Sequence, residues 1–571
     1  MSATPDDGRL NLCWSQALVD GLAMAGLREL ILSPGARSSP LALAFLRQPA
    51  IRCHVVLDER SAAFFALGVA KVSGFPAAVL CTSGSAPANW YPAVIEADYA
   101  GIPLLLLSAD RPPELLGWGA NQTIDQLQLF GRHVRAFFAP GPPGADFSVS
   151  QMQHLAARAC RDSRWPSPGP VHLNLAFREP LLPSVAVAGP STPPAAAVRL
   201  AAPLVQPDAP LVAHTAAAIS RRRGVIVCGG ADFSPPFAEA VTALAGQLDC
   251  PVFAEALSNL RFGKHDRSRL CVRYDAFLRQ PGWLAGAQPE WVLRFGAFPL
   301  ARSLQDWLNT LAGAQHMLVA PDHRWPDPLH RTATLIQADP LAVCTALLAA
   351  APEPGPASWR ASFARAEARV EAMAAGHRAH ENSAAALIPA LIEQLPAGHR
   401  LFCGNSLPIR ELDAFSGSGD KPLRIFGNRG ASGIDGNLST ALGIATEGPC
   451  LALLGDLTAQ HDLTALAVAG GHDIIVLVIN NGGGGIFEYL PMANLPEFER
   501  AWLTPQRLDF RAAAECFGLA YRRTCSLVEL RAGLAQALQE GGPWLLELVL
   551  DRRVSVARQR AFWAAAAALV S

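Results

Sequence analysis

The chain has 571 residues, of which 50% are hydrophobic and 17% are charged, and its formal net charge is −1. A hydrophobic and nearly neutral chain is not disordered, and it has no broad charged surface for nucleic acid or an anionic membrane. The 12 cysteines are scattered without Cys-x-x-Cys pairs, which favours reduced thiols in a cytoplasmic protein over a disulfide framework. The acidic N-terminus is unlike a signal peptide, and every apolar run is far shorter than the ~20 residues of a membrane helix.

Two proline-rich stretches divide the chain, at Pro183–Pro210 and Ala351–Ala357. Extended segments of this composition are typical of linkers between domains. They predict three domains, at residues 1–185, 205–350 and 360–571.

Each predicted domain alternates short apolar runs with helix-like segments. Continuous apolar runs followed by glycine-containing turns indicate buried parallel strands with helices on both faces. We therefore expect an α/β fold of three doubly wound parallel-sheet domains. The expected strands are Glu29–Leu32, Ala77–Cys81, Leu104–Ser108, Val171–Leu175, Gly224–Cys228, Pro251–Ala254, Trp291–Phe295, His316–Val319, Arg400–Cys403, Cys450–Leu454, Ile474–Ile479 and Trp544–Leu548. Ligands of such sheets bind beyond the carboxyl ends of the strands.

An acidic pair, Asp58 and Glu59, follows the apolar run Cys53–Leu57 and precedes an alanine-rich helix. Taken alone, the pair fits acids that cap the start of a helix. Its position directly after an apolar run also allows a role in a ligand site.

Two expected strands of the third domain end in polar residues. Cys450–Leu454 is followed by Gly455 and Asp456, and Ile474–Ile479 is followed by two asparagines and four glycines. The Asp456 carboxylate, the Asn481 amide oxygen and a main-chain carbonyl near Gly483 are the hard oxygen ligands that Mg²⁺ prefers. Glycines also let main-chain N–H groups close around phosphate oxygens. Each motif alone fits an ordinary turn, but the pair at two strand ends predicts a metal and diphosphate site.

Gly-Asp-x followed by Asn-Asn resembles the cofactor motif of the thiamin-diphosphate enzyme superfamily, with Leu457 where the family often has glycine. The resemblance implies thiamin diphosphate with Mg²⁺ or Mn²⁺ as cofactors. It implies that Glu59 activates the aminopyrimidine ring and that the turn Thr82–Ser85 lies against this ring. The implied cofactor-binding residues are Glu59, Ser83, Ile434, Asp456, Leu457, Thr458, Asn481, Gly483, Gly484 and Ile486, with Asp456, Asn481 and Gly483 as metal ligands.

Five further segments resemble the MenD-type synthase family of menaquinone biosynthesis: Ser33–Leu41, Ala109–Glu114, Gly119–Gln122, Gly404–Arg410 and Asn428–Gly436. The middle domain matches only loosely. This resemblance implies decarboxylation of 2-oxoglutarate and addition of the resulting carbanion to isochorismate, giving 2-succinyl-5-enolpyruvyl-6-hydroxy-3-cyclohexene-1-carboxylate.

These two substrates have four carboxylates, and arginine is the side chain best suited to bind them. Arg37, Arg111, Arg410 and Arg429 are expected in loops after strands, within the family-like segments, although each alone also fits a surface ion pair. Arg302 aligns weakly with a family lysine, and Ala36 stands where the family commonly has serine. The resemblance further implies that Gln122 orients the reacting intermediate, that Ser406 contacts substrate, that Ile434 holds the cofactor bent, and that Ile486, Phe487 and Leu490 form an apolar wall that excludes water.

Two alternatives remain open: another thiamin-dependent 2-oxoacid decarboxylase or acetohydroxyacid-type synthase, and an inactive binding paralogue. The family also implies a homo-oligomer, dimer or tetramer, because Glu59 and the metal motif of one site come from different subunits. No nucleic-acid or membrane partner is expected.

Overall fold

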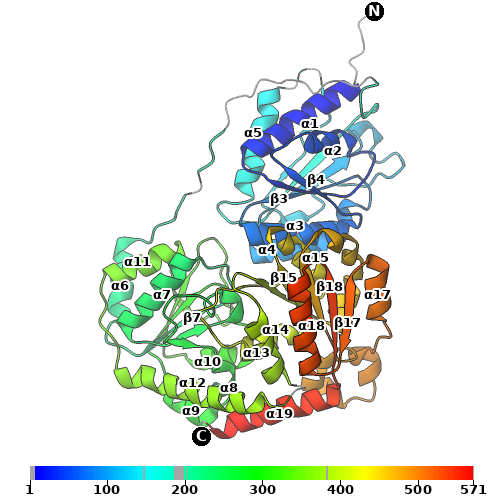
Figure 1. The fold of residues 1–571 in the computed structure, drawn as a ribbon. Coiled ribbons are helices and arrows are strands. Elements are labelled where there is room, and N and C mark those ends of the chain that lie inside the picture. The colour runs from blue at the N-terminus through cyan, green and yellow to red at the C-terminus, as the bar shows by residue number, and fades with distance from the viewer. Residues whose placement is uncertain are drawn as a thin grey trace, which may run out of the picture. The chain divides into compact units, whose positions relative to one another are not determined.

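The computed structural model describes residues 7–144, 146, 148–184, 198–201, 203–380 and 383–569. Three six-stranded parallel sheets with helices account for the fold (Figure 1), which confirms the predicted α/β class. The chain forms two compact units: unit 1 is Met1–Ala202, Asn428–Pro449 and Thr458–Ile474, and unit 2 is Pro203–Gly427, Cys450–Leu457 and Ile475–Ser571. Pro190, Pro193 and Pro194 of the predicted first linker lie outside the described residues, and the predicted domain boundaries stay predictions.

The first sheet lies in unit 1 and has the strand order β2-β1-β3-β4-β6-β5. Apolar side chains of the strands pack against α1, α2 and α5 on one face, and α3 and α4 cover the other face (Figure 1). The strands are β1 Glu29–Leu32, β2 Arg52–Val55, β3 Ala77–Cys81, β4 Leu104–Asp110, β5 Ala136–Phe138 and β6 Pro170–Ala176. The helices are α1 Asp7–Met24, α2 Ser39–Leu46, α3 Glu59–Ser73, α4 Tyr91–Ala100 and α5 Val149–Asp162, and α15 Asn437–Ile444 also belongs to this unit.

The second sheet lies in unit 2 and has the order β12-β11-β10-β7-β8-β9. One apolar cluster joins it to α6, α7 and α11, and another joins it to α8, α10 and α12. The strands are β7 Gly224–Cys228, β8 Val252–Ala254, β9 Leu270–Cys271, β10 Trp291–Phe295, β11 Gln315–Val319 and β12 Thr332–Ile336. The helices are α6 Ala209–Ile219, α7 Pro235–Leu248, α8 Tyr274–Phe277, α9 Pro281–Gly286, α10 Arg302–Thr310, α11 Pro340–Ala349 and α12 Ala357–His377.

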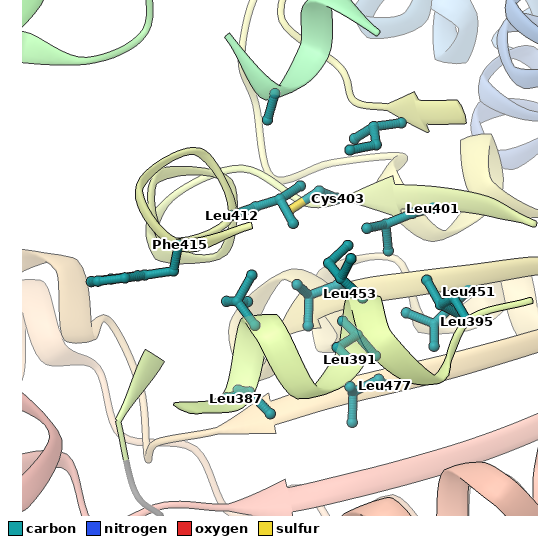
Figure 2. Close-up of a cluster of buried hydrophobic side chains, with 14 of the residues drawn as sticks. Leu387, Leu391, Leu395, Leu401, Cys403, Leu412, Phe415, Leu451, Leu453 and Leu477 are labelled. Atoms are coloured by element: carbon teal, nitrogen blue, oxygen red, sulfur yellow. The ribbon is translucent and has the colours of Figure 1, made fainter. Parts of the chain in front are cut away.

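The third sheet, also in unit 2, has the order β14-β13-β15-β16-β18-β17. Alternate residues of its strands point to the same face, so Leu401 and Cys403 pack with Leu451 and Leu453 under α13 and α14 (Figure 2). The strands are β13 Arg400–Cys403, β14 Arg424–Phe426, β15 Cys450–Gly455, β16 Ile474–Asn480, β17 Ala520–Thr524 and β18 Trp544–Val549. The remaining helices are α13 Ala384–Gln394, α14 Leu407–Phe415, α16 Asp456–His461, α17 Phe510–Phe517, α18 Leu527–Glu540 and α19 Arg552–Leu569.

The twelve expected strands are all present, with ends that differ by at most two residues. The six other strands, β2, β5, β9, β12, β14 and β17, are not among the twelve, and they form the two edges of each sheet. An edge strand is short or half-exposed, as the burial of β12 and β17 shows, so it lacks a continuous apolar run.

The strand orders show where each sheet reverses its direction of winding. The reversal lies between β1 and β3 in the first sheet and between β13 and β15 in the third. Ligands of open α/β sheets bind at such switch points, beyond the carboxyl ends of the strands. In the described part of the chain, no helix is long and apolar enough to cross a membrane.

Candidate active site

The predicted site residues fall into two groups, one in each unit. Unit 1 contains Arg37, Glu59, Ser83, Arg111, Gln122, Arg429, Ile434 and Thr458. Unit 2 contains Arg302, Ser406, Arg410, Asp456, Leu457, Asn481, Gly483, Gly484, Ile486, Phe487 and Leu490.

Asp456 lies directly after β15, and its carboxylate reaches the loop after the neighbouring strand β16. Its Oδ2 accepts a hydrogen bond of 2.7 Å from the main-chain nitrogen of Gly483, and its Oδ1 accepts one of 2.9 Å from that of Leu457. Burial raises the pKa of Asp456 to about 6, although these main-chain donors act in the opposite direction. The two strand-end motifs therefore meet, as the sequence predicted from their positions.

The two asparagines after β16 have different environments. Asn480 donates a hydrogen bond of 2.6 Å to Glu547 of β18, so this side chain links β16 to its neighbour β18. The Oδ1 atom of Asn481 is buried and has no hydrogen-bond partner in the described part of the chain. A buried oxygen without a partner costs about 1–3 kcal/mol, and a cation ligated there would remove this cost.

The side-chain atoms of Asp456 and Asn481 that could bind a metal are oxygens, which suit Mg²⁺ or Mn²⁺ better than a soft metal. The described residues contain no cluster of three or more His, Cys, Asp or Glu side chains that would hold a metal by themselves. The predicted set of one carboxylate, one amide and one main-chain oxygen would need phosphate and water as its remaining ligands.

The glycine loop after Asn481 is closely packed against the chain near Leu503. Gly483 has a φ of +128°, and a Cβ atom there would lie 2.2 Å from the carbonyl oxygen of Leu503. The nitrogen of Gly484 donates a 2.7 Å hydrogen bond to the same oxygen. Only glycine fits at Gly483. Ile486 and Phe487 follow in a half-buried 3₁₀ turn and Leu490 is exposed, so their role as an apolar wall stays a prediction.

Ser406 immediately precedes α14, and its backbone has a φ of +75°. A non-glycine residue held there stores about 1–3 kcal/mol of strain, and such strain is typical of functional sites. Arg410 was expected in a loop, but it lies within α14, because the helix begins at Leu407 with Pro408 in its first turn. Its guanidinium donates a 2.7 Å hydrogen bond to the main-chain oxygen of Ser406.

The acidic pair at the start of α3 has divided roles. Asp58 is the N-cap, and its carboxylate accepts hydrogen bonds from the nitrogens of Arg60 at 2.9 Å and Ser61 at 3.2 Å. Glu59 is half-buried and accepts no hydrogen bond from a described residue. Burial, and then the charge of Glu59, raises the pKa of the Cys81 thiol, which places Glu59 near the end of β3. Since Asp58 caps the helix, the Glu59 carboxylate is available for a ligand.

Four predicted residues of unit 1 lie together beyond β1, β3 and β4. Arg111 donates hydrogen bonds to the hydroxyl of Ser83 and, at 2.8 Å, to the main-chain oxygen of Gln122. Burial, and then the positive charge of Arg37, lowers the pKa of Arg111. Arg37 itself is buried and pairs with Glu179 at 2.6 Å. The Glu179 carboxylate offsets part of the positive charge of these two guanidinium groups, and their role in binding a substrate anion stays a prediction.

Arg302 has a different environment from the other predicted arginines. Its side chain is 80% exposed and pairs with Asp306, one helical turn further on, at 2.9 Å. This is an ordinary surface ion pair. Among the described residues, the structure shows no hydrogen bond between Arg302 and another predicted site residue.

The loop that contains Arg429 and Ile434 is held by a residue that the sequence did not indicate. Glu96 of α4 is 2% exposed and accepts hydrogen bonds from the nitrogens of Gly430 at 2.8 Å and Ala431 at 2.6 Å. Lys71 lies 3.6 Å from the same carboxylate. No local motif marks Glu96, because the loop nitrogens that it holds lie more than 330 positions away.

Comparisons with known proteins identify the family of the chain. Three protein-family models match in order: the N-terminal TPP binding domain of thiamine pyrophosphate enzymes at residues 14–129, the middle domain at 204–403 and the C-terminal TPP binding domain at 417–548. The fold and these matches define the class as that of the thiamine pyrophosphate enzymes.

Two relatives identify the family to which the chain belongs within this class. The chain is 49% identical to the 2-succinyl-5-enolpyruvyl-6-hydroxy-3-cyclohexene-1-carboxylate synthase of Dechloromonas aromatica (strain RCB), with 95% of this chain and 99% of the relative covered. It is 40% identical to the synthase of the same name from Geobacillus kaustophilus (strain HTA426), with 96% and 97% covered. The chain therefore belongs to the 2-succinyl-5-enolpyruvyl-6-hydroxy-3-cyclohexene-1-carboxylate synthase family, which confirms the resemblance predicted from its motifs.

A solved structure shows the same fold. Benzoylformate decarboxylase from Polynucleobacter necessarius matches with a TM-score of 0.70, covering 94% of this chain and 98% of that one. The two sequences are only 16% identical, so the likeness concerns the fold alone.

Proposed function

We propose that this chain catalyses the thiamin-diphosphate-dependent decarboxylation of 2-oxoglutarate and joins the remaining four-carbon unit to isochorismate. The product is 2-succinyl-5-enolpyruvyl-6-hydroxy-3-cyclohexene-1-carboxylate, an intermediate of menaquinone biosynthesis. The observation that carries this proposal is the 49% identity, over nearly the full length of both chains, to a synthase named for that product. The grouping of arginines at the switch point of the first sheet supports it, because both substrates are dicarboxylates.

The residues beyond β15 and β16 fit the diphosphate and its metal. Asp456, the unpartnered oxygen of Asn481 and the main-chain oxygen of Gly483 would hold Mg²⁺ or Mn²⁺. Leu457, Thr458, Gly484 and Ile486 would surround the diphosphate and the adjoining ring. When bound, thiamin diphosphate supplies the nucleophilic carbon and the electron sink that decarboxylation of a 2-oxoacid requires.

The residues of unit 1 fit the other end of the cofactor. Glu59 would hold a proton at the aminopyrimidine ring, since its carboxylate has no other described partner. Ser83 would lie against the same ring, and the half-exposed Ile434 would give apolar contact with the cofactor. Gln122 would orient the reacting group. Its φ of +54° is a strained conformation of the kind that functional sites retain.

The arginines would bind the substrate carboxylates. Arg37 and Arg111 would form one anion-binding group, and Arg410 and Arg429 lie in two further family-like segments, with Ser406 beside Arg410. Arg302 would act only if its surface pair with Asp306 opened. Phe487 and Leu490 would exclude water, which protects a carbanion from early protonation.

The proposal includes a cytoplasmic homo-oligomer, dimer or tetramer, in which each active site takes residues from two subunits. Light scattering coupled to size-exclusion chromatography gives the number of subunits. Mixing a Glu59→Gln chain with an Asp456→Asn chain tests the shared site, because only an oligomer with sites between subunits would regain activity in one of its sites.

The decisive experiment follows the ultraviolet absorbance of isochorismate in the presence of 2-oxoglutarate, thiamin diphosphate and Mg²⁺. We expect isochorismate to be consumed only when all three are present. Well-folded, cofactor-bound protein that leaves isochorismate unchanged would overturn the proposal. If the same protein released carbon dioxide from pyruvate, it would instead be a simple 2-oxoacid decarboxylase.

A further inference from the structure

One buried glutamine, Gln126, links the sheet of unit 1 to the turn Thr82–Ser85, which is predicted to lie against the aminopyrimidine ring. Its side chain is 0% exposed. The amide nitrogen donates to the main-chain oxygen of Ala109 at 3.2 Å and to Oδ1 of Asn174 at 2.9 Å, and the amide oxygen accepts from the nitrogen of Gly84 at 3.0 Å. Only a group with donors on one side and an acceptor on the other satisfies all three partners, so the amide is held in one orientation.

The two groups that accept hydrogen bonds from the Gln126 amide belong to neighbouring strands, Ala109 to β4 and Asn174 to β6. Asn174 donates a 2.7 Å hydrogen bond to Asp110, and it accepts one of 2.8 Å from the hydroxyl of Ser108. Ser108 also makes a 2.7 Å hydrogen bond with His172. These side chains are all buried and form one connected network, which gives Gln126 a rigid base.

Gly84, which donates to the amide oxygen of Gln126, adjoins a group of three predicted site residues. The Gln122 amide donates a 3.0 Å hydrogen bond to the main-chain oxygen of Ser83, and the hydroxyl of Ser83 donates one of 3.2 Å to the main-chain oxygen of Gln122. Arg111 donates to both of these residues. The turn at Ser83–Gly84 and the segment around Gln122 are therefore joined to each other, and Gln126 joins them to the strands.

Gly84 requires such a support. Its φ is +85°, and a Cβ atom there would lie 2.8 Å from Cγ of Gln122. The turn has no side chain at this point to hold it by packing, so the hydrogen bond from its nitrogen to Gln126 fixes its position.

We infer that Gln126 is a positioning residue, which sets the places of Gly84, Gln122 and Arg111 relative to the strand ends without itself touching cofactor or substrate. The inference rests on the proposed function, because it assigns the purpose of this arrangement to that reaction. A buried glutamine with a merely structural role would affect the stability of the fold and leave the reaction unchanged.

Gln126→Met tests the inference, because methionine fills a similar volume and removes all three hydrogen bonds. Gln153→Met is the matched control: Gln153 is also a buried glutamine of unit 1, 4% exposed, but it lies in α5 on the opposite face of the sheet. We expect Gln126→Met to speed amide hydrogen exchange in the peptide containing Gly84 about tenfold, which corresponds to about 1.4 kcal/mol of lost protection. We expect kcat at saturating cofactor and substrates to fall about tenfold in Gln126→Met and to remain within about twofold in Gln153→Met.

The inference is overturned if Gln126→Met keeps the kcat of the unsubstituted enzyme, or if its exchange at Gly84 is unchanged. Should Gln126→Met fail to fold, the unsubstituted protein still provides a test, because exchange of the Gly84 amide at the rate of an open loop would contradict the hydrogen bond to Gln126. Failure of the proposed function is a separate result, since it would appear as inactivity of the unsubstituted, cofactor-bound enzyme with isochorismate while the exchange measurements stayed as expected.

Discussion

The main-chain nitrogen of Gly483 donates a 2.7 Å hydrogen bond to the carboxylate of Asp456, and this bond joins the loops that follow two neighbouring strands of the third sheet. The loop that donates this bond also contains Asn481, whose buried Oδ1 has no hydrogen-bond partner among the described residues. The bond acts to lower the pKa of Asp456, against the burial that raises it.

Asp456→Asn separates the charge of this residue from its hydrogen bond. The amide oxygen of asparagine still accepts from Gly483, while its NH2 group replaces the oxygen that accepts from Leu457. The negative charge that a divalent cation requires is lost. We expect the affinity for thiamin diphosphate with Mg²⁺ to fall about 100-fold, as measured by quenching of tryptophan fluorescence, while the melting temperature of the protein without cofactor does not fall. Asp509→Asn, at the exposed N-cap of α17, is the control and should bind normally. Equal affinities for the two variants would remove Asp456 from the metal site.

Gly483→Ala tests the close packing of the glycine loop. The new Cβ would lie 2.2 Å from the carbonyl oxygen of Leu503, so the loop has to move. We expect a loss of about 2 kcal/mol or more in unfolding free energy, together with weaker binding of thiamin diphosphate. Gly542→Ala is the control, since Gly542 also has a positive φ, of +80°, but has open space around it. This substitution should cost only about 1 kcal/mol. A Gly483→Ala enzyme with unchanged cofactor affinity would contradict the role of this loop.

Asp58 and Glu59 are adjacent acids with opposite expected behaviour. Asp58→Ala removes the N-cap of α3 and should lower the unfolding free energy by about 1 kcal/mol, with kcat reduced only slightly. Glu59→Gln should leave the melting temperature unchanged and lower kcat about 100-fold, because the amide does not hold the proton that general acid–base chemistry requires. Thermal denaturation and steady-state kinetics on both variants check the pair. An active Glu59→Gln enzyme would show that the acid acts elsewhere.

His172 makes the stability of unit 1 depend on pH. Burial lowers its pKa to about 3, whereas an exposed histidine titrates near 6.5. Below pH 6.5 the unfolded chain therefore binds a proton that the folded chain does not, and unfolding becomes easier by about 1.4 kcal/mol per pH unit until about pH 3. We expect the melting temperature to fall more steeply between pH 7.5 and pH 5.5 in the unsubstituted protein than in His172→Gln. Parallel slopes for the two proteins would rule out a neutral, buried His172.

The central strands could be predicted because both of their faces are buried. β1, β3, β7, β10 and β13 have the bounds expected from the sequence, since most of their residues are apolar and buried. The edge strands could not be predicted in this way. β17, for example, is partly exposed along most of its length.

The predicted site residues that the structure brings together are those recognisable from short motifs at strand ends, such as Asp456 with Gly483 and Ser83 with Arg111 and Gln122. The sequence did not indicate Glu96 or Gln126. Each is an ordinary polar residue whose importance depends on distant partners, at separations of 334 positions for Glu96 with Gly430 and 42 for Gln126 with Gly84.

The sequence by itself determined the α/β class, the central strands, the polar residues that follow them, and the family to which the chain belongs. These are local properties, because apolar runs, glycine turns and capping acids act over a few residues. The tertiary structure decided which strand ends are neighbours. Strand order depends on which side of the sheet each crossover places the next strand, and this is a property of packing over the whole sheet. It therefore took the fold to put the loops after β1 and β3, and those after β13 and β15, at the two switch points where the candidate site residues gather.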